Sequence, residues 1–160
     1  MFSIFKKKSK NFTIKAPIDG VCKDLSEVPD EVFSEKMMGD GIAIEPTGDV
    51  LCAPIDGTIT MLIDSHHAFG MTSPEGIEVL VHCGLETVNL KGQGFEVLKN
   101  VNDKVKAGEP IIKVDRAFME KENIPLITPV IVINPLDKQI VSYHVGEQVK
   151  VKDSDILELA

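Results

Sequence analysis

Tryptophan is absent from this 160-residue sequence, tyrosine occurs once, and aromatic residues make up only 5% of it. Basic residues are also scarce, since 17 Lys+Arg face 25 Asp+Glu and give a formal net charge of −8 at pH 7. A nucleic-acid binder needs a basic face to displace phosphate counterions, so we expect no nucleic-acid partner. An acidic surface serves solubility, or it favours partners with a basic or neutral docking face.

Long apolar runs are missing too. The first ten residues, MFSIFKKKSK, contain no apolar run as long as a signal peptide needs. No apolar stretch elsewhere is long enough for a transmembrane helix. We expect residues 1–11 to be a flexible basic N-terminal tail. Its lysines and apolar residues form either a solubilising tail or a weak interfacial membrane anchor.

Cysteine is limited to Cys22, Cys52 and Cys83. The number is odd and no CxxC pair occurs, so the sequence predicts neither a disulfide framework nor a structural zinc site. A cytoplasmic location fits best.

Helical signal is thin. From residue 12 onward, short extended runs alternate with turn signals about every ten residues, which favours an all-β fold. We predict one domain over residues 12–160, an antiparallel β-sandwich or barrel-sandwich hybrid. One or two very short helices are expected, over residues 31–38 and 117–122. The segment APIDG at 16–20 recurs at 53–57, and we interpret the two copies as duplicated corners leading into strands.

A glycine-bracketed run at 76–84 contains the first candidate functional residue, His82. As a strand it would point Val79 and Val81 into the core and Leu80 and His82 to the open face. A second strand is expected near residues 58–63, followed by His67. A hairpin turning through residues 70–74 would bring His67 beside His82.

Two adjacent neutral imidazoles can divide labour, one as nucleophile or ligand and the other as hydrogen-bond donor to a developing anion. The alternative is that both are packed residues without a function. Catalytic zinc wants three protein ligands, and neither a third ligand nor an HExxH motif is evident. The GQG segment at 92–94 lacks the lysine and hydroxyl of a phosphate-binding loop and is better interpreted as a turn.

Seven motifs follow one another along the chain: VPDEVF (28–33), GDGIAI (39–44), PTG (46–48), DSHHAF (64–69), VHCGLETV (81–88), LKGQGF (90–95) and TPV (128–130). In this order they resemble the glucose-type enzyme IIA component of the bacterial phosphoenolpyruvate-dependent sugar phosphotransferase system. The resemblance extends from about residue 14 to the C-terminus.

This resemblance implies a phosphoryl relay. His82 matches the family's phosphoryl acceptor, which takes the group from the histidine-containing phosphocarrier protein and passes it to a cysteine on the IIB domain of a sugar permease. His67 matches the histidine that stabilises the transition state, and Ser65 stands where the family commonly has threonine, to orient an imidazole. No cofactor is implied. Zinc would bind only as a bridge at His67 and His82 completed by a partner carboxylate.

The resemblance also implies an apolar docking rim around the two histidines, with an acidic residue beside it. The matching positions are Val32, Phe33, Ile63, Leu80, Cys83 and Glu86. For Cys83 strand alternation favours packing in the core instead.

Two other functions remain as alternatives. Zinc-dependent hydrolases occur on related sandwich folds, and in such an enzyme the histidine pair would be zinc ligands. Strand-turn units at 105–112 and 145–149 look like those of lipoyl- and biotinyl-carrier domains, for which Lys36 would be the modified lysine.

Overall fold

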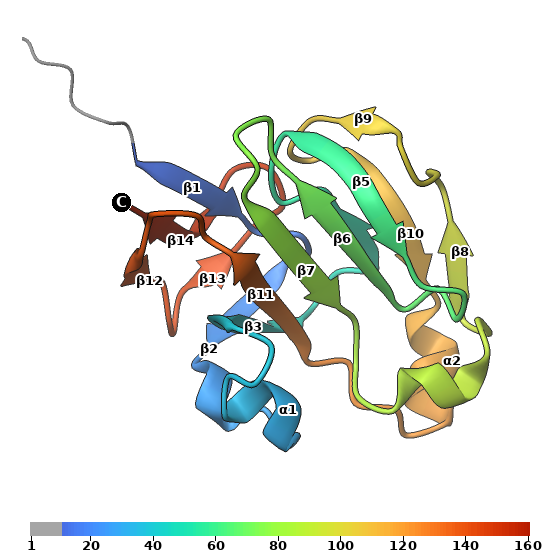
Figure 1. Ribbon diagram of the computed structural model, residues 1–160. Coiled ribbons are helices and arrows are strands. Elements are labelled where there is room, and N and C mark those ends of the chain that lie inside the picture. The colour runs from blue at the N-terminus through green and yellow to red at the C-terminus, as the bar shows by residue number, and fades with distance from the viewer. Residues whose placement is uncertain (1–10) are drawn as a thin grey trace, which may run out of the picture.

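The computed structural model describes residues 11–160 (Figure 1). The basic tail predicted for residues 1–11 therefore lies, except for Asn11, outside the described residues. The strands are β1 (Phe12–Lys15), β2 (Gly20–Lys23), β3 (Asp40–Pro46), β4 (Val50–Cys52), β5 (Gly57–Leu62), β6 (Ala68–Thr72), β7 (Glu78–His82), β8 (Phe95–Val97), β9 (Lys104–Val105), β10 (Pro110–Val114), β11 (Thr128–Asn134), β12 (Ile140–Tyr143), β13 (Gln148–Val149) and β14 (Asp155–Leu159). The helices are α1 (Glu31–Ser34) and α2 (Arg116–Lys121), with 3-10 turns η1 (Leu25–Glu27) and η2 (Thr87–Leu90).

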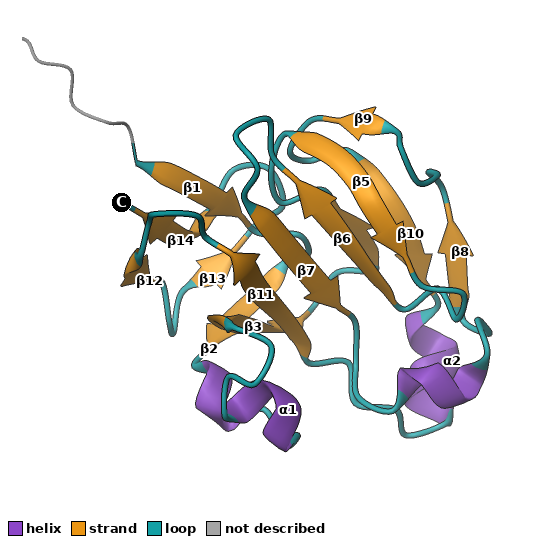
Figure 2. Ribbon diagram, in the orientation of Figure 1, coloured by secondary structure: helices purple, strands orange, loops and turns teal. Residues whose placement is uncertain are grey.

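All strand pairings are antiparallel. An eight-stranded sheet has the order β13-β2-β3-β11-β7-β6-β5-β9, and two three-stranded sheets have the orders β1-β14-β12 and β4-β10-β8. Figure 2 shows the short helical segments at the end of the strands toward which β7 runs. The predicted all-β antiparallel sandwich is confirmed. Among residues 11–160 no helix combines the length and apolar character needed to cross a bilayer.

The large sheet consists of two similar halves, and each half contains one copy of the APIDG corner. The first copy leads into β2, which pairs with β13, and the second leads into β5, which pairs with β9. In each copy the aspartate accepts a backbone hydrogen bond from the turn that follows the partner strand. Asp19 Oδ1 accepts from Val151 N at 2.8 Å, and Asp56 Oδ1 accepts from Ala107 N at 2.8 Å. The interpretation as duplicated corners is supported by this geometry.

The glycine that ends each corner has a packing reason. A Cβ on Gly20 would lie 2.3 Å from the Glu45 carbonyl oxygen, and one on Gly57 would lie 2.3 Å from the Thr72 carbonyl oxygen. Any larger residue would push the neighbouring strand away from the corner, so the repeat keeps glycine at both positions.

The sheet has apolar clusters on both faces. The inner face carries the main core, which includes Val79, Val81 and Cys83. The outer face carries a second cluster, composed of Leu25, Val28, Phe33, Ala43, Ala68, Leu80, Leu85, Ile127 and Ile131. The prediction that Leu80 lies on an open face is therefore wrong. The outer face of the sheet is covered, because η1, α1 and the loops before η2 and β11 supply apolar residues that pack on it.

Two local predictions also need correction. The helix expected over residues 31–38 ends at Ser34, because Lys36 has a φ of 59° and Gly39 a φ of 139°, values that no α-helix continues through. The turn expected over residues 70–74 lies at 73–77 instead, between β6 and β7. Gly70 belongs to β6, and the Met61 side chain covers it. A Cβ added to Gly70 would lie 3.4 Å from the Met61 Cβ.

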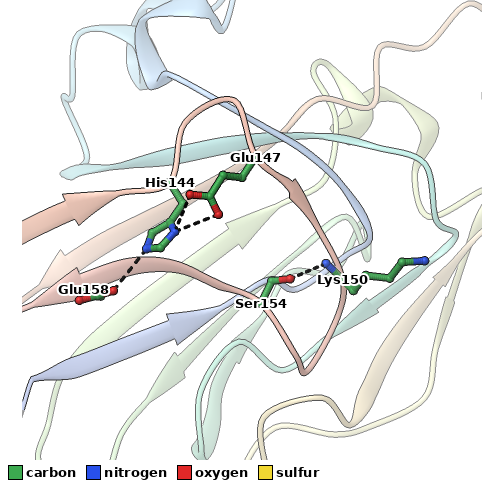
Figure 3. Close-up of polar contacts among 5 residues, drawn as sticks. All are labelled: His144, Glu147, Lys150, Ser154 and Glu158. Atoms are coloured by element: carbon green, nitrogen blue, oxygen red, sulfur yellow. Dashed lines mark hydrogen bonds and ion pairs between the residues drawn. The ribbon is translucent and has the colours of Figure 1, made fainter.

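His144, just after β12, ties the C-terminal strands together (Figure 3). Its Nδ1 lies 3.0 and 3.1 Å from the two carboxylate oxygens of Glu147, and its Nε2 lies 3.3 Å from Glu158 Oε2 on β14. A neutral imidazole donates from one nitrogen only, so this arrangement favours imidazolium. Burial lowers the pKa of His144, but the bonds to Glu147 and Glu158 outweigh burial and raise it above its ordinary value.

We expect a His144→Gln variant to lose stability at pH 6 and to match the unmodified protein more closely at pH 9. Because the folded-state pKa is raised, the stabilisation is fully present below the unfolded pKa of about 6.5 and is lost as the pH rises through the folded value. The loss should stay below about 1 kcal/mol, since the carboxylates are partly solvated. Urea unfolding at the two pH values measures it, and an equal loss at both would contradict the charge assignment.

Candidate functional site

The β6–β7 hairpin brings the two predicted histidines together. Ala68 pairs with His82, and Cys83 N donates to the His67 carbonyl oxygen at 2.7 Å. The imidazole centroids lie 4.7 Å apart, with the rings nearly perpendicular at 77°. The turn that precedes His67 includes His66 in the left-handed region, with a φ of 67°. Sequence reasoning therefore predicted the pairing correctly, although it placed the hairpin turn too early.

His82 is held in one tautomer by the backbone. Its Nδ1 lies 2.9 Å from the Gly84 carbonyl oxygen. A carbonyl oxygen only accepts, so Nδ1 carries the proton and Nε2 keeps a free lone pair. The ring of Phe33 lies 5.0 Å from the His82 ring and fills the space against it from α1.

His67 is the more enclosed of the two, with 2% of its surface exposed. Its Nδ1 lies 3.0 Å from Ser65 Oγ, across the turn between β5 and β6. A hydroxyl donates or accepts, so this contact is compatible with either tautomer. The ring of Phe95, at the start of β8, lies 6.4 Å from the His67 ring.

The surroundings hold both histidines in the neutral form at pH 7. Burial and the neighbouring His67 lower the pKa of His82 to about 4, against opposing effects of the Gly84 carbonyl and the Asp30 carboxylate. Burial also lowers the pKa of His67, more than a hydrogen bond to the backbone of Ser65 raises it. Two neutral imidazoles in contact offer one nucleophilic nitrogen and one N–H donor. At an ordinary pKa of about 6.5, a proton would occupy the nucleophilic nitrogen in part of the molecules at pH 7.

We expect the His82 imidazole to titrate with a midpoint near pH 4 in NMR spectra of the folded protein. A histidine in the unfolded chain titrates at about pH 6.5. Between these values the unfolded chain binds more protons, so the free energy of unfolding should fall as the pH drops from about 6.5 to 4. A His82→Gln variant should show a weaker fall. A His82 midpoint above pH 6 would contradict the assigned burial.

The predicted rim residues occupy different depths around this pair. Val32 is 39% exposed, Ile63 is half-buried and Glu86 is exposed. Phe33 and Leu80 are buried in the outer cluster beneath them.

Cys83 contradicts its predicted place on the rim. It has no exposed surface and packs in the main core with Val79 and Val81, because alternation along β7 turns it away from His82. Burial raises the pKa of its thiol to about 12, so the thiol is neutral.

Sequence reasoning missed other residues on this side of the molecule. Met61 pairs with Gly70, which pairs with Leu80, so the Met61 side chain lies on the outer face in one row with Leu80. It is 39% exposed. Met37, just after α1, is 70% exposed. Strand alternation from Ile63 back to Met61 could have indicated the first, whereas no sequence pattern indicates Met37.

The donor set around the pair does not make a metal centre by itself. Within residues 11–160, no group of three or more His, Cys, Asp or Glu side chains has the geometry to hold a metal ion. The pair supplies two imidazoles, one fewer than a catalytic zinc takes from its protein.

The fold and the site define a β-sandwich domain with a paired-histidine centre. Residues 12–138 match the family described as phosphoenolpyruvate-dependent sugar phosphotransferase system, EIIA 1. The chain belongs to this family, and it is accordingly a phosphotransferase component of the sugar phosphotransferase system.

Relatives agree with this membership. The glucoside-specific EIICBA component of Staphylococcus carnosus (strain TM300) is 50% identical over 135 residues, which is 84% of this chain and 19% of the relative. The glucose-specific EIICBA component of the same strain is 48% identical over 145 residues, which is 90% of this chain and 21% of the relative. The chain thus spans about a fifth of the length of these two proteins. The solved glucose permease IIA from Mycoplasma capricolum superposes with a TM-score of 0.86 at 36% identity, covering 94% of this chain and 96% of that one.

Proposed function

We propose that His82 accepts a phosphoryl group from the histidine-containing phosphocarrier protein and passes it to a cysteine on the IIB domain of a glucose-type sugar permease. The observation that carries the proposal is the bond from His82 Nδ1 to the Gly84 carbonyl, beside His67. It leaves Nε2 of a neutral imidazole free as the nucleophile. The N–P bond of the donor breaks as the N–P bond to Nε2 forms, and His82 keeps its Nδ1 proton throughout.

His67 has the complementary role in this proposal. Phosphoryl transfer passes through a loose transition state whose negative charge lies on the equatorial oxygens. An imidazole at 4.7 Å between centroids is close enough to donate from Nε2–H to those oxygens. Because burial keeps water away from it, its N–H donates without prior rearrangement of solvent.

Ser65 orients His67. If the Ser65 hydroxyl donates to His67 Nδ1 across their 3.0 Å contact, the ring proton must sit on Nε2, where the donor is needed. The same contact fixes the rotation of the ring. Ser65 is therefore assigned to histidine orientation and makes no contact with the phosphoryl group itself.

The docking surface is formed by exposed apolar residues over a buried layer. Val32, Ile63 and Met61 present apolar surface, Phe33 and Leu80 are buried in the outer cluster against which Ile63 packs, and Glu86 supplies an exposed carboxylate. A small apolar patch with an acidic neighbour suits brief contact with basic partners, as fast exchange requires. Cys83, which is buried in the core, stands outside this surface.

The alternatives receive no support. The family and the relatives are those of a phosphotransferase component, neither a hydrolase nor a carrier domain. Lys36, the lysine considered for a carrier domain, is paired with Asp40 at 3.3 Å. Zinc stays assigned only to a bridge at His67 and His82 that a partner carboxylate would complete.

A cytoplasmic location belongs to the proposal, since both partners act on that side of the membrane. The four lysines among residues 1–10 also predict weak attraction to anionic lipid, at about 1 kcal/mol for each basic residue near the surface. Co-sedimentation with anionic vesicles that is unchanged after deletion of residues 1–10 would remove this part of the proposal.

The test is reconstitution of the relay. The protein is incubated with phosphoenolpyruvate, enzyme I and the phosphocarrier protein, and its intact mass is measured before and after acid treatment. We expect one acid-labile phosphate, mapped to His82. A folded sample that takes no phosphate from an active carrier would overturn the proposal.

A further inference from the structure

The Gly84 carbonyl decides which nitrogen of His82 is free, so whatever fixes this carbonyl controls the nucleophile. The two peptide units around Gly84 are each held at both ends. In the first unit, the Cys83 carbonyl accepts from Thr87 Oγ1 at 2.8 Å, and Gly84 N donates to the Ile127 carbonyl at 3.2 Å. In the second unit, the Gly84 carbonyl accepts from His82 Nδ1, and Leu85 N donates to the Pro125 carbonyl at 3.1 Å.

The side chain of Thr87 differs from the other partners. Gly84 N and Leu85 N donate to backbone carbonyls of the segment before β11. Many different sequences could supply such backbone acceptors. The hydrogen bond to the Cys83 carbonyl comes from a side chain. Apart from the bond made by His82, this is the hydrogen bond to the two peptide units that depends on the identity of a side chain. Neither the sequence motifs nor the proposed reaction assigns Thr87 a role.

Thr87 is built into this position. It is fully buried and begins η2, after Glu86 has reversed the chain with a φ of 58°. This reversal returns the Thr87 side chain to the Cys83–Gly84 peptide. A Cβ on Gly84 would lie 2.7 Å from Thr87 Cγ2 and 2.7 Å from the Pro125 carbonyl oxygen. The threonine methyl thus packs against Gly84, while its hydroxyl holds the preceding carbonyl oxygen by a hydrogen bond.

We propose that Thr87 is a positioning residue for His82: its hydroxyl fixes the Cys83–Gly84 peptide and thereby aims the Gly84 carbonyl at His82 Nδ1, which keeps Nε2 unprotonated. This inference rests on the proposed function for its consequence in phosphoryl transfer. The geometric part concerns the tautomer alone and is measured without any phosphate.

The variant that separates hydroxyl from shape is Thr87→Val. Valine keeps the methyl that covers Gly84 but leaves the buried Cys83 carbonyl without a donor, a loss that a peptide relieves by turning. The matched restoring variant is Thr87→Ser, which returns the hydroxyl without the methyl. The control is Ser73→Ala, because Ser73 is also a buried hydroxyl and its bond to Ile77 N closes the opposite end of β7.

The tautomer is measured from the ¹⁵N shifts of the His82 ring, and the rate of phosphorylation by the phosphocarrier protein is measured in parallel. In Thr87→Val we expect Nε2 to gain protonated character and the rate to fall about fivefold to tenfold, the equivalent of one hydrogen bond. Thr87→Ser should recover both, and Ser73→Ala should change the tautomer in neither direction. If Thr87→Val does not fold, Thr87→Cys keeps the volume with a weaker donor and should give a smaller shift of the same sign.

A folded Thr87→Val or Thr87→Cys protein with the original His82 tautomer would overturn the positioning role, even if phosphorylation slowed. Failure of the unmodified protein to accept phosphate would instead overturn the proposed function. The ¹⁵N shifts would still decide whether Thr87 fixes the tautomer, so the two failures are distinguishable.

Discussion

A His82→Gln protein is expected to carry no phosphate after incubation with phosphoenolpyruvate, enzyme I and the phosphocarrier protein. Glutamine approximates the size of the imidazole and can still approach the Gly84 carbonyl, but its amide nitrogen is not nucleophilic. The loss should therefore be complete, rather than a reduction in rate. Intact mass after short and long incubations measures it.

The matched control for this variant is His66→Asn. His66 is the histidine next to the pair, and its ring packs over Gly92, with Nδ1 3.1 Å from the position of a Cβ there. Asparagine tolerates the left-handed φ of 67° at this position. The control should accept one phosphate as the unmodified protein does. Phosphate on the His82→Gln protein would show that another residue is the acceptor.

A His67→Gln protein is expected to accept phosphate on His82 and to pass it on about 10²–10³-fold more slowly, the range found when one transition-state donor is removed. His82 still has its free Nε2, so the first N–P bond still forms. Transfer to a thiolate adds the charge of the nucleophile to that of the equatorial oxygens. A missing donor should therefore be felt more strongly in the second step.

Single-turnover measurements separate the two steps of this variant. The first follows phosphate from the carrier to His82, and the second follows phosphate from the isolated phosphoprotein to the IIB domain. Ser65→Ala provides a graded comparison, because it keeps the His67 ring and removes only the hydroxyl at 3.0 Å from Nδ1. A His67→Gln protein that loses both steps equally would contradict the division of roles.

The sequence was sufficient for the histidine pair because both residues belong to local patterns. His82 ends an apolar strand, and His67 was expected after the apolar run near residues 58–63, so a turn between them was enough to predict that they meet. The separate strand β6, which lies between His67 and that turn, was not predicted. Alternation also separated Val81 from His82 correctly. It placed Cys83 in the core, where its full burial confirms that interpretation over the rim.

What covers each face of the sheet is not a local property. Leu80 is buried because Leu25, Phe33 and Ile127, from three distant segments, meet on the outer face, and no periodicity within one strand encodes that meeting. The end of α1 was missed for a related reason. Residues 31–38 have no proline or glycine to stop a helix, and nothing in the local sequence predicts the left-handed conformation of Lys36. Thr87 was unrecognised because its bond depends on a left-handed residue at Glu86.

The two APIDG corners differ in how much chain they enclose. The hydrogen bond from Ala107 to Asp56 spans 51 residues, whereas the bond from Val151 to Asp19 spans 132. The entropy of loop closure grows with the logarithm of length, so the second closure costs about 0.8 kcal/mol more than the first. The histidine hairpin lies within the shorter loop. The half of the molecule that holds the nucleophile therefore closes on itself at lower entropic cost than the half that joins the two ends of the chain.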